Sequence, residues 1–165
     1  MISKKVILTG SFGVGKTSLF NRFVYSRFSD KYLTTIGVKV NKKVLQVEDE
    51  ELSILLWDIA GEVSQDKVPV SYFLGAHGII YVFDLTRPIT YKNIESDIVY
   101  LKGLLPTGVI KIVGNKKDLV SDAQIEAISD SLTRKFDILT SAKTGENVDA
   151  LFQELGVDLL ATVSK

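Results

Sequence analysis

The sequence predicts one α/β domain with a mainly parallel β-sheet, and three observations support that prediction. Apolar runs typical of buried strands alternate with segments of helical periodicity over almost the whole chain. A glycine-rich loop joins the first of these strands to the first helix. Polar motifs follow directly after several strands, at the edge of the sheet where α/β proteins bind their ligands. The chain has 165 residues and no change of composition that would indicate a second domain.

Six segments are predicted to be strands because they are short, apolar and bounded by polar stretches. The run 78–84 is apolar almost throughout, which indicates a strand buried on both faces. The second and third segments flank the acidic turn 48–51, which predicts a hairpin. The predicted strands are Val6–Thr9, Val38–Glu48, Glu51–Trp57, Gly78–Asp84, Val109–Gly114 and Ile138–Thr140.

Four segments are predicted to be helices because apolar residues recur in them three or four positions apart. In the second of these, Ile94, Ile98 and Leu101 form one stripe. The polar stretches 27–35 and 58–70 are predicted loops, the latter partly helical. The predicted helices are Lys16–Ser26, Thr90–Gly103, Asp122–Phe136 and Asn147–Val163.

Composition narrows the possible partners and location. Lys and Arg number 20, as do Asp and Glu, so no bulk charge favours nucleic acid or an anionic membrane. The chain contains no Cys, which excludes disulfides, thiolate metal sites and Cys-based lipid anchors within it. The first predicted strand begins almost at once, which leaves no room for a signal peptide. We therefore expect a cytoplasmic protein.

The segment Gly10–Thr17, Gly-Ser-Phe-Gly-Val-Gly-Lys-Thr, fits the pattern G-x-x-x-x-G-K-[ST] between a predicted strand and a predicted helix. Glycines allow successive backbone N–H groups to form a concave anion-binding nest, to which the helix N-terminus adds its dipole. We predict that this loop holds a phosphate chain. Lys16 would contact the β- and γ-phosphates, and the hydroxyl of Thr17 would bind Mg²⁺. The alternative is an ordinary glycine-rich turn before a helix.

A second motif, Asn-Lys-Lys-Asp at 115–118, follows another buried strand. The Asp118 carboxylate can accept two hydrogen bonds, and guanine offers two adjacent donors, N1–H and the 2-amino group. Adenine would leave such a carboxylate unpaired, so a buried Asp118 favours guanine. Taken alone, the motif is explained equally well by a capped turn before a helix.

Two further motifs follow strands. Asp58 and Gly61 belong to a string, Asp-Ile-Ala-Gly-Glu, in which the carboxylate can hold Mg²⁺ through water and the glycine N–H can reach a γ-phosphate. The string Ser-Ala-Lys at 141–143 could offer backbone N–H groups to the guanine O6. Each string alone is more typical of a turn.

Taken together and in order, these motifs resemble those of the small GTPases of the Ras superfamily, and within it most resemble the Rab family. The resemblance covers nearly the whole chain and includes Thr34–Val38, Leu56–Gly61 and Tyr72–Ile80. It implies a P-loop NTPase three-layer sandwich, with a six-stranded, mainly parallel sheet flanked by five helices. It also implies a GTP/GDP-binding switch that hydrolyses GTP with Mg²⁺.

The resemblance assigns roles to individual residues. Thr35 would be the switch threonine that binds Mg²⁺ in the GTP state, with Thr17 and Asp58 completing the protein's share of the metal site. Phe28 would pack edge-on against the guanine, and Tyr32 would cover the phosphates. The implied catalytic residues are Lys16, Thr35, Gly61 and Glu62. The implied nucleotide-binding residues are Gly13, Val14, Gly15, Lys16, Thr17, Ser18, Phe28, Tyr32, Thr35, Gly61, Asn115, Lys116, Asp118, Ser141, Ala142 and Lys143.

The sequence departs from the family pattern in three places. Phe12 occupies a position that is usually small, and Glu62 stands where the water-orienting Gln is expected. Both departures predict slow intrinsic hydrolysis. No C-terminal prenylation signal follows the last predicted helix. We expect membrane association only through a partner, or through a tail absent from this sequence.

The resemblance also implies a partner surface. Rab-like proteins contact effectors through an aromatic triad beside the switch segments, and the matching positions here hold Val40, Trp57 and Tyr72. Two of the three aromatics are kept. We expect a monomer that binds effector, exchange-factor and activating proteins through the switch segments and these three residues.

Other classes of function stay open at this point. A P-loop ATPase or kinase is disfavoured by Asp118 within its motif. A constitutive GTP-binding module with negligible turnover is favoured by Phe12 and Glu62. A structural protein with a vestigial pocket is disfavoured by Lys16, Thr17 and Asp118.

Overall fold

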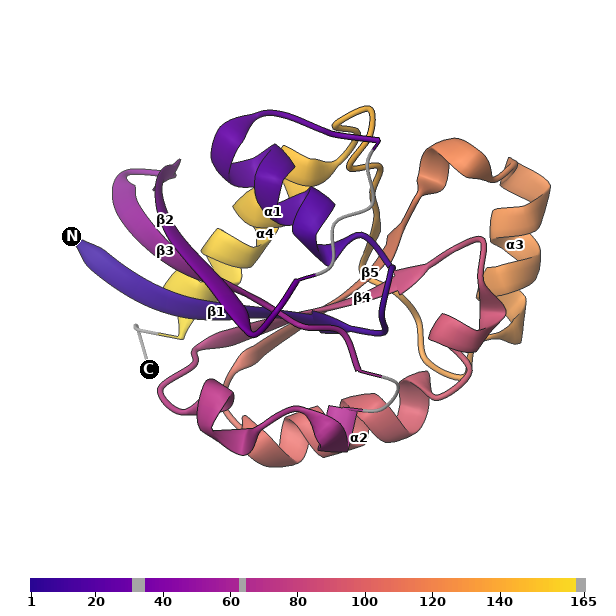
Figure 1. The fold of residues 1–165 in the computed structure, drawn as a ribbon. Helices are drawn as coiled ribbons and strands as arrows, with labels where there is room; N and C mark the ends of the chain where they lie inside the picture. Colours follow the sequence, from indigo (N-terminus) through magenta and orange to yellow (C-terminus); the bar gives the residue numbers. More distant parts are fainter. Residues whose placement is uncertain (31–34, 63–64, 163–165) are drawn as a thin grey trace.

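The computed structural model describes residues 1–30, 35–62 and 65–162, and these form a six-stranded sheet in the order β2-β3-β1-β4-β5-β6 (Figure 1). β2 and β3 form the antiparallel hairpin, and every other neighbouring pair is parallel. This confirms the predicted mixed, mainly parallel sheet. The strands are β1 (Ile2–Gly10), β2 (Val38–Val47), β3 (Glu50–Ile59), β4 (Gly78–Asp84), β5 (Val109–Asn115) and β6 (Ile138–Leu139).

The described residues contain four α-helices, whereas the family resemblance implied five. They are α1 (Lys16–Tyr25), α2 (Ile94–Leu104), α3 (Asp122–Ser131) and α4 (Val148–Ala161). The stretch after β3 instead forms two short 3₁₀ helices, Gln65–Lys67 and Val70–Phe73, on either side of Pro69. Proline has no N–H to donate and its ring clashes with a preceding helical turn, so one continuous helix cannot run through this position.

Two helix boundaries differ from the sequence prediction for identifiable reasons. The helix predicted to start at Thr90 begins only at Ile94. The residues before it form a 3₁₀ turn, Pro88–Thr90, in which the Thr90 hydroxyl donates to Arg87 O at 2.7 Å. α3 ends at Ser131 rather than Phe136 because the following chain turns back toward β5, where Asp137 accepts from Ile112 N at 2.7 Å. The helical spacing of apolar residues continues in the sequence past Ser131, although the helix ends there.

The sheet has a separate apolar core on each face. α1 and α4 cover one face, where Phe23 of α1 stacks on Phe152 of α4 with ring centroids 3.5 Å apart. α2 and the Ile128 side chain of α3 pack on the other face with the 3₁₀ segments. The arrangement is the predicted three-layer sandwich. The loops between strand ends and helices gather at one edge of the sheet.

Candidate functional site

A cavity of about 300 Å³ lies at the carboxyl edge of the parallel strands. It is formed by the loop between β1 and α1, by residues of the two segments that precede β2 and follow β3, and by the loops after β5 and β6. Most of the predicted nucleotide-binding residues line it. These are Gly13, Gly15, Lys16, Thr17, Ser18, Phe28, Thr35, Gly61, Asn115, Lys116, Asp118, Ala142 and Lys143.

Among the described residues, four of the predicted site residues do not line this cavity: Val14, Asp58, Glu62 and Ser141. Val14 is a fully buried residue of the phosphate loop, and Ser141 is buried next to Asp118, to which its hydroxyl donates. Glu62 lies near the phosphate loop, with its amide donating to Gly10 O at 3.4 Å. Tyr32 lies outside the described residues.

The loop 10–17 has the backbone that its glycines predict. Gly10 has φ 144°, and a Cβ there would lie 2.2 Å from the carbonyl oxygen of Val82, so only glycine fits. Gly15 has φ 100° and directly precedes α1, whose N-terminus faces the cavity. Backbone N–H groups and a helix N-terminus therefore converge where a phosphate chain would lie.

Lys16 is buried at this N-terminus, and its ammonium group donates to the carbonyls of Gly10 at 3.2 Å and Ser11 at 3.0 Å. Burial lowers the pKa of Lys16 from 10.5 to about 8, against the opposing effect of the Asp58 carboxylate. A desolvated cation whose hydrogen bonds go to neutral carbonyls is suited to bind an anion, because phosphate oxygens would add ionic partners.

The pKa of Lys16 predicts how stability depends on pH when no nucleotide is bound. Between pH 8 and 10.5 the unfolded chain carries more protons on this residue than the folded chain, so stability rises with pH there. We expect the Tm of the nucleotide-free protein to rise from pH 8 to 10 relative to that of Lys16→Met. Thermal unfolding at several pH values measures this, and parallel curves for the two proteins would contradict it.

Three oxygen-bearing side chains meet beside Lys16. The hydroxyl of Thr17 donates to Asp58 Oδ2 at 2.6 Å and lies 2.5 Å from the hydroxyl of Thr35, which itself is 3.3 Å from Asp58 Oδ2. α1, the segment before β2 and the end of β3 each supply one member of this oxygen cluster. The predicted metal ligands are thus brought together.

The oxygen cluster fits Mg²⁺. Asp58 Oδ1 is buried and has no hydrogen-bond partner among the described residues, so it is available to a cation or its water. Burial raises the pKa of Asp58, which a bound cation would reverse. No group of three or more His, Cys, Asp and Glu side chains suited to a metal occurs in the described part of the chain. Mg²⁺ would therefore take further oxygens from phosphate and water.

The opposite end of the cavity carries the residues predicted to bind a base. Asp118 Oδ1 accepts from the Ser141 hydroxyl at 2.7 Å, which fixes the carboxylate at the cavity wall. The ammonium group of Lys116 lies 2.8 Å from Asp84 Oδ2 and donates to Gly13 O at 3.1 Å. Its stem therefore runs between the base end and the phosphate loop.

Asn115 connects these loops from behind. Its Nδ2 donates to Val14 O at 3.1 Å, and its Oδ1 accepts from the Thr140 hydroxyl at 3.0 Å and from Ala142 N at 3.2 Å. The amide of Ala142, one of those expected to reach guanine, thus has a partner within the protein. Asn115 acts as a connector between the loops as well as a wall residue.

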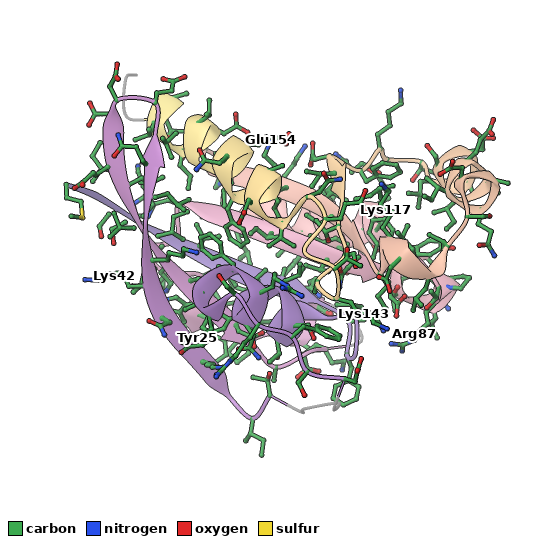
Figure 2. All side chains as sticks on the ribbon, turned by 90° about the horizontal axis from the view of Figure 1, so that it is seen from above. Tyr25, Lys42, Arg87, Lys117, Lys143 and Glu154 are labelled. Carbon is green, nitrogen blue, oxygen red and sulfur yellow. The ribbon has the colours of Figure 1, made fainter. Side chains whose placement is uncertain are left out.

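Gly61 lies directly against the phosphate loop. A Cβ on this glycine would be 2.6 Å from Phe12 Cα and 3.0 Å from Lys16 Nζ. Gly61, the predicted γ-phosphate contact, therefore lies close to the ammonium group of Lys16. Phe12 is 49% exposed and lines the cavity, and its carbonyl accepts from the Arg87 guanidinium at 3.0 Å. Figure 2 labels Arg87 and Lys143 where the loops after β4 and β6 approach this edge.

Sequence reasoning missed several residues of the site. The ammonium group of Lys39 donates to Asn21 Oδ1 at 3.0 Å, and Lys39 pairs with Asp58 across the β2–β3 hairpin. The predicted hairpin could have indicated this pair, because residues directly opposite each other on two strands have their side chains on the same face. The cavity-lining residues that were not predicted to bind nucleotide are Phe12, Asn21, Ser29, Asp30, Ile59 and Leu119.

The three residues of the expected partner surface lie together. Val40 is 43% exposed and pairs with Trp57 across the hairpin, and the rings of Trp57 and Tyr72 have centroids 6.4 Å apart. Sequence reasoning missed Lys5, whose ammonium group lies 3.7 Å from the Trp57 ring centroid and donates to Leu74 O. One face of the indole is therefore covered by a cation.

Known proteins are similar to this chain over most of its length. The sequence pattern of the Ras family matches residues 5–161. Ras-related protein Rab-13 of Bos taurus is 34% identical over 161 residues, which are 94% of this chain and 79% of that protein. Ras-related protein RABA1h of Arabidopsis thaliana is 36% identical over 166 residues, covering 98% and 76% of the two chains. Ras-related protein Rab-1A of Dictyostelium discoideum is 33% identical, covering 94% and 79%. The chain therefore belongs to the Ras family of small GTPases, and Rab-related proteins are among its relatives.

Proposed function

We propose that this protein is a switch that binds GTP and GDP with Mg²⁺ and hydrolyses GTP slowly. Membership of the Ras family supports a GTP-binding switch in general. The observation that carries the specific proposal is the oxygen cluster of Thr17, Thr35 and Asp58 beside the buried ammonium of Lys16, with Asp118 at the other end of one cavity.

Different residues along the cavity bind different parts of the nucleotide. Lys16 and the N–H groups of the phosphate loop bind and orient the β- and γ-phosphates. Asp118 pairs with the guanine N1–H and 2-amino group. When bound, Mg²⁺ would offset phosphate charge, held by the hydroxyls of Thr17 and Thr35 and by Asp58. Thr35 and Gly61 belong to the two segments that would respond to the γ-phosphate.

The nucleotide preference tests this assignment directly. We expect GDP and GTP to raise the Tm of the nucleotide-free protein far more than ADP and ATP at equal concentration, because only guanine satisfies the Asp118 carboxylate. Differential scanning fluorimetry with excess Mg²⁺ measures the shifts. Equal protection by adenine and guanine nucleotides would reject the proposal.

Slow hydrolysis follows from Glu62 and Phe12. An ionised Glu62 accepts hydrogen bonds but donates none, and its charge is repelled by the phosphates, so it orients the attacking water poorly. The Phe12 ring stands at the γ-phosphate end of the cavity, where water or an arginine from an activating protein must enter. The Gly61 amide remains the group available to contact the γ-phosphate.

Single-turnover hydrolysis measures the rate. We expect Glu62→Gln to raise the rate at least tenfold because the amide supplies a donor and removes the repelled charge. Phe12→Gly should raise it further by opening the same end of the cavity. A wild-type rate that neither substitution increases would contradict this account and favour the second candidate, a constitutive GTP-binding module with negligible turnover.

We further propose that effectors and regulators bind the switch segments and the surface of Val40, Trp57 and Tyr72. The Trp57 indole N–H is buried without a hydrogen-bond partner among the described residues, and Lys5 covers the ring. The surface therefore combines an aromatic anchor with a cation, the composition of a binding hot spot. We also propose that the protein is a monomer and associates with membranes through a partner or a lipid tail. In the described ranges, no helix is both long and apolar enough to cross a bilayer.

A further inference from the structure

Asp84, the last residue of β4, is a fully buried carboxylate that does not line the cavity. Its Oδ1 accepts from the backbone N–H of Thr86 at 2.8 Å and from the Thr86 hydroxyl at 2.6 Å. Its Oδ2 lies 2.8 Å from the ammonium group of Lys116 and 4.0 Å from the guanidinium group of Arg87. Two cations therefore share one buried carboxylate, and we call Asp84, Arg87 and Lys116 the charge cluster.

Both cations of the charge cluster donate to the phosphate loop, at consecutive carbonyl groups. Arg87 Nη1 donates to Phe12 O at 3.0 Å, and Lys116 Nζ donates to Gly13 O at 3.1 Å. In a trans peptide group the C=O and N–H bonds point in opposite directions, so each contact also fixes the direction of an N–H. The Phe12 carbonyl fixes the N–H of Gly13, and the Gly13 carbonyl fixes the N–H of Val14.

The two N–H groups fixed in this way are available to a ligand. Among the described residues, neither Gly13 N nor Val14 N donates to a carbonyl oxygen of the protein. Gly13 lines the cavity, and both residues belong to the loop that precedes the N-terminus of α1. Successive backbone N–H groups in such a loop form the nest in which an anion binds.

Gly13 does not by itself determine which way its peptide groups face. Glycine adopts positive and negative φ about equally readily, and Gly13 has φ 76°. If either peptide group flipped, a carbonyl oxygen would take the place of an N–H and repel a phosphate. Contacts from outside the loop are therefore needed to select the orientation that binds an anion, and the charge cluster supplies them.

We propose that Asp84 and Arg87 are positioning residues that orient the phosphate loop toward the β-phosphate of a guanine nucleotide. This inference deepens the proposed function and rests on it. Through the carbonyls of Phe12 and Gly13, the charge cluster keeps the N–H groups of Gly13 and Val14 turned toward the phosphates. Donors that are oriented before a ligand binds need no reorganisation, so they hold the anion more tightly.

Fold stability does not account for the charges of this cluster. Replacing a buried ion pair by apolar residues of similar volume is often neutral or stabilising. The charges instead strengthen the contacts with the loop, because hydrogen bonds from ionised donors are roughly twice as strong as those between neutral groups. The Arg87 side chain is 44% exposed, so without the Asp84 carboxylate it would turn into water and leave the Phe12 carbonyl.

The test compares the affinities of the nucleotide-free full chain for GDP and GMP, measured by competition with fluorescent GDP. GMP has the same base and lacks the β-phosphate. Arg87→Met removes the donor to the Phe12 carbonyl and keeps a long side chain, whereas Asp84→Asn removes the charge that holds both cations. We expect the preference for GDP over GMP to fall about 2- to 10-fold in Arg87→Met and about 10- to 100-fold in Asp84→Asn.

Two further variants separate orientation from a general loss of structure. Arg134→Met is the matched control, because it makes the same chemical change at an arginine that pairs with Glu95 and does not line the cavity. It should keep the wild-type preference. Arg87→Lys keeps a positive charge and a donor for the Phe12 carbonyl, so it should keep more of the preference than Arg87→Met. Phosphorus NMR of bound GDP should show a larger shift of the β-phosphate signal than of the α-phosphate signal in Arg87→Met.

A merely structural role would lower Tm and reduce the affinities for GDP and GMP by the same factor, and that result would overturn the proposal. An unchanged preference in Arg87→Met would also overturn it, and this variant decides the question if Asp84→Asn does not fold. A wild-type protein that binds no guanine nucleotide would instead reject the proposed function, so the two failures are distinguishable.

Discussion

Replacement of Asp118 by asparagine is expected to lower the affinity for GDP and GTP by about 10²- to 10⁴-fold. The Asp118 carboxylate lies in the cavity wall, where the Ser141 hydroxyl fixes Oδ1 at 2.7 Å. Two hydrogen bonds from guanine to this charged group are each worth about 1.5–3 kcal/mol, and about 1.4 kcal/mol is a factor of ten in affinity. Asparagine presents N–H₂ toward the guanine 2-amino group, so two donors oppose each other.

The same substitution should favour xanthine nucleotides, whose 2-oxo group accepts from the new amide. Isothermal titration with GDP and XDP measures both affinities. Asp122→Asn is the matched control, because it makes the same chemical change in the first turn of α3 on a residue that does not line the cavity. Equal loss of GDP and XDP binding would show that the carboxylate shapes the loop instead of reading the base.

Phe23→Ala is expected to destabilise the protein by about 3–5 kcal/mol, the usual cost of deleting a buried aromatic ring. Phe23 is 1% exposed, and its ring stacks on that of Phe152 with an interplanar angle of 8°. The ammonium group of Lys43 lies over the Phe23 ring at 4.7 Å and donates to the Phe23 carbonyl near the end of α1. Removing the ring therefore weakens the contacts of α1 with both α4 and β2.

Chemical denaturation followed by circular dichroism measures this loss, and a fall in Tm of about 6–20 °C should accompany it in a domain of this size. Phe12→Ala is the matched control, since it deletes the same ring from a half-exposed position. A loss below 1 kcal/mol for Phe23→Ala, or equal losses for both variants, would mean that the α1–α4 contact contributes little to stability.

Local sequence patterns best predicted the bounds of elements whose residues are all buried to the same degree. β4 was predicted with both ends correct because all its residues are buried. β1 extends to Ile2, beyond its predicted start, because Ser3 and Lys5 pair with β3 through their backbone although their side chains are polar. Periodicity gives no information on such pairing, nor on the contact that ends α3 before Phe136.

The phosphate-loop and base motifs were predictable for a related reason, since each is a short string whose chemistry depends on its own residues. Hydrogen bonds between residues far apart in the sequence were not predictable. Asn115 bonds to Val14 across 101 positions in the sequence, and Gln65 reaches Asp97 across 32. Both depend on strand order and register. Glu62 was predicted as a site residue because it belongs to a motif. The buried Gln65, three positions later, was not predicted because it belongs to no motif.

The bonds of Asn115 have a consequence for how nucleotide leaves the protein. This side chain joins the phosphate loop to the loops after β5 and β6, so these parts of the cavity wall are linked to one another by hydrogen bonds. The opposite wall is made by Phe28, Thr35 and Gly61, which come from segments outside these linked loops. We therefore expect nucleotide release to begin with movement of these segments. On the proposed function, we expect an exchange factor to act on the segments before β2 and after β3 rather than on the loops after β5 and β6.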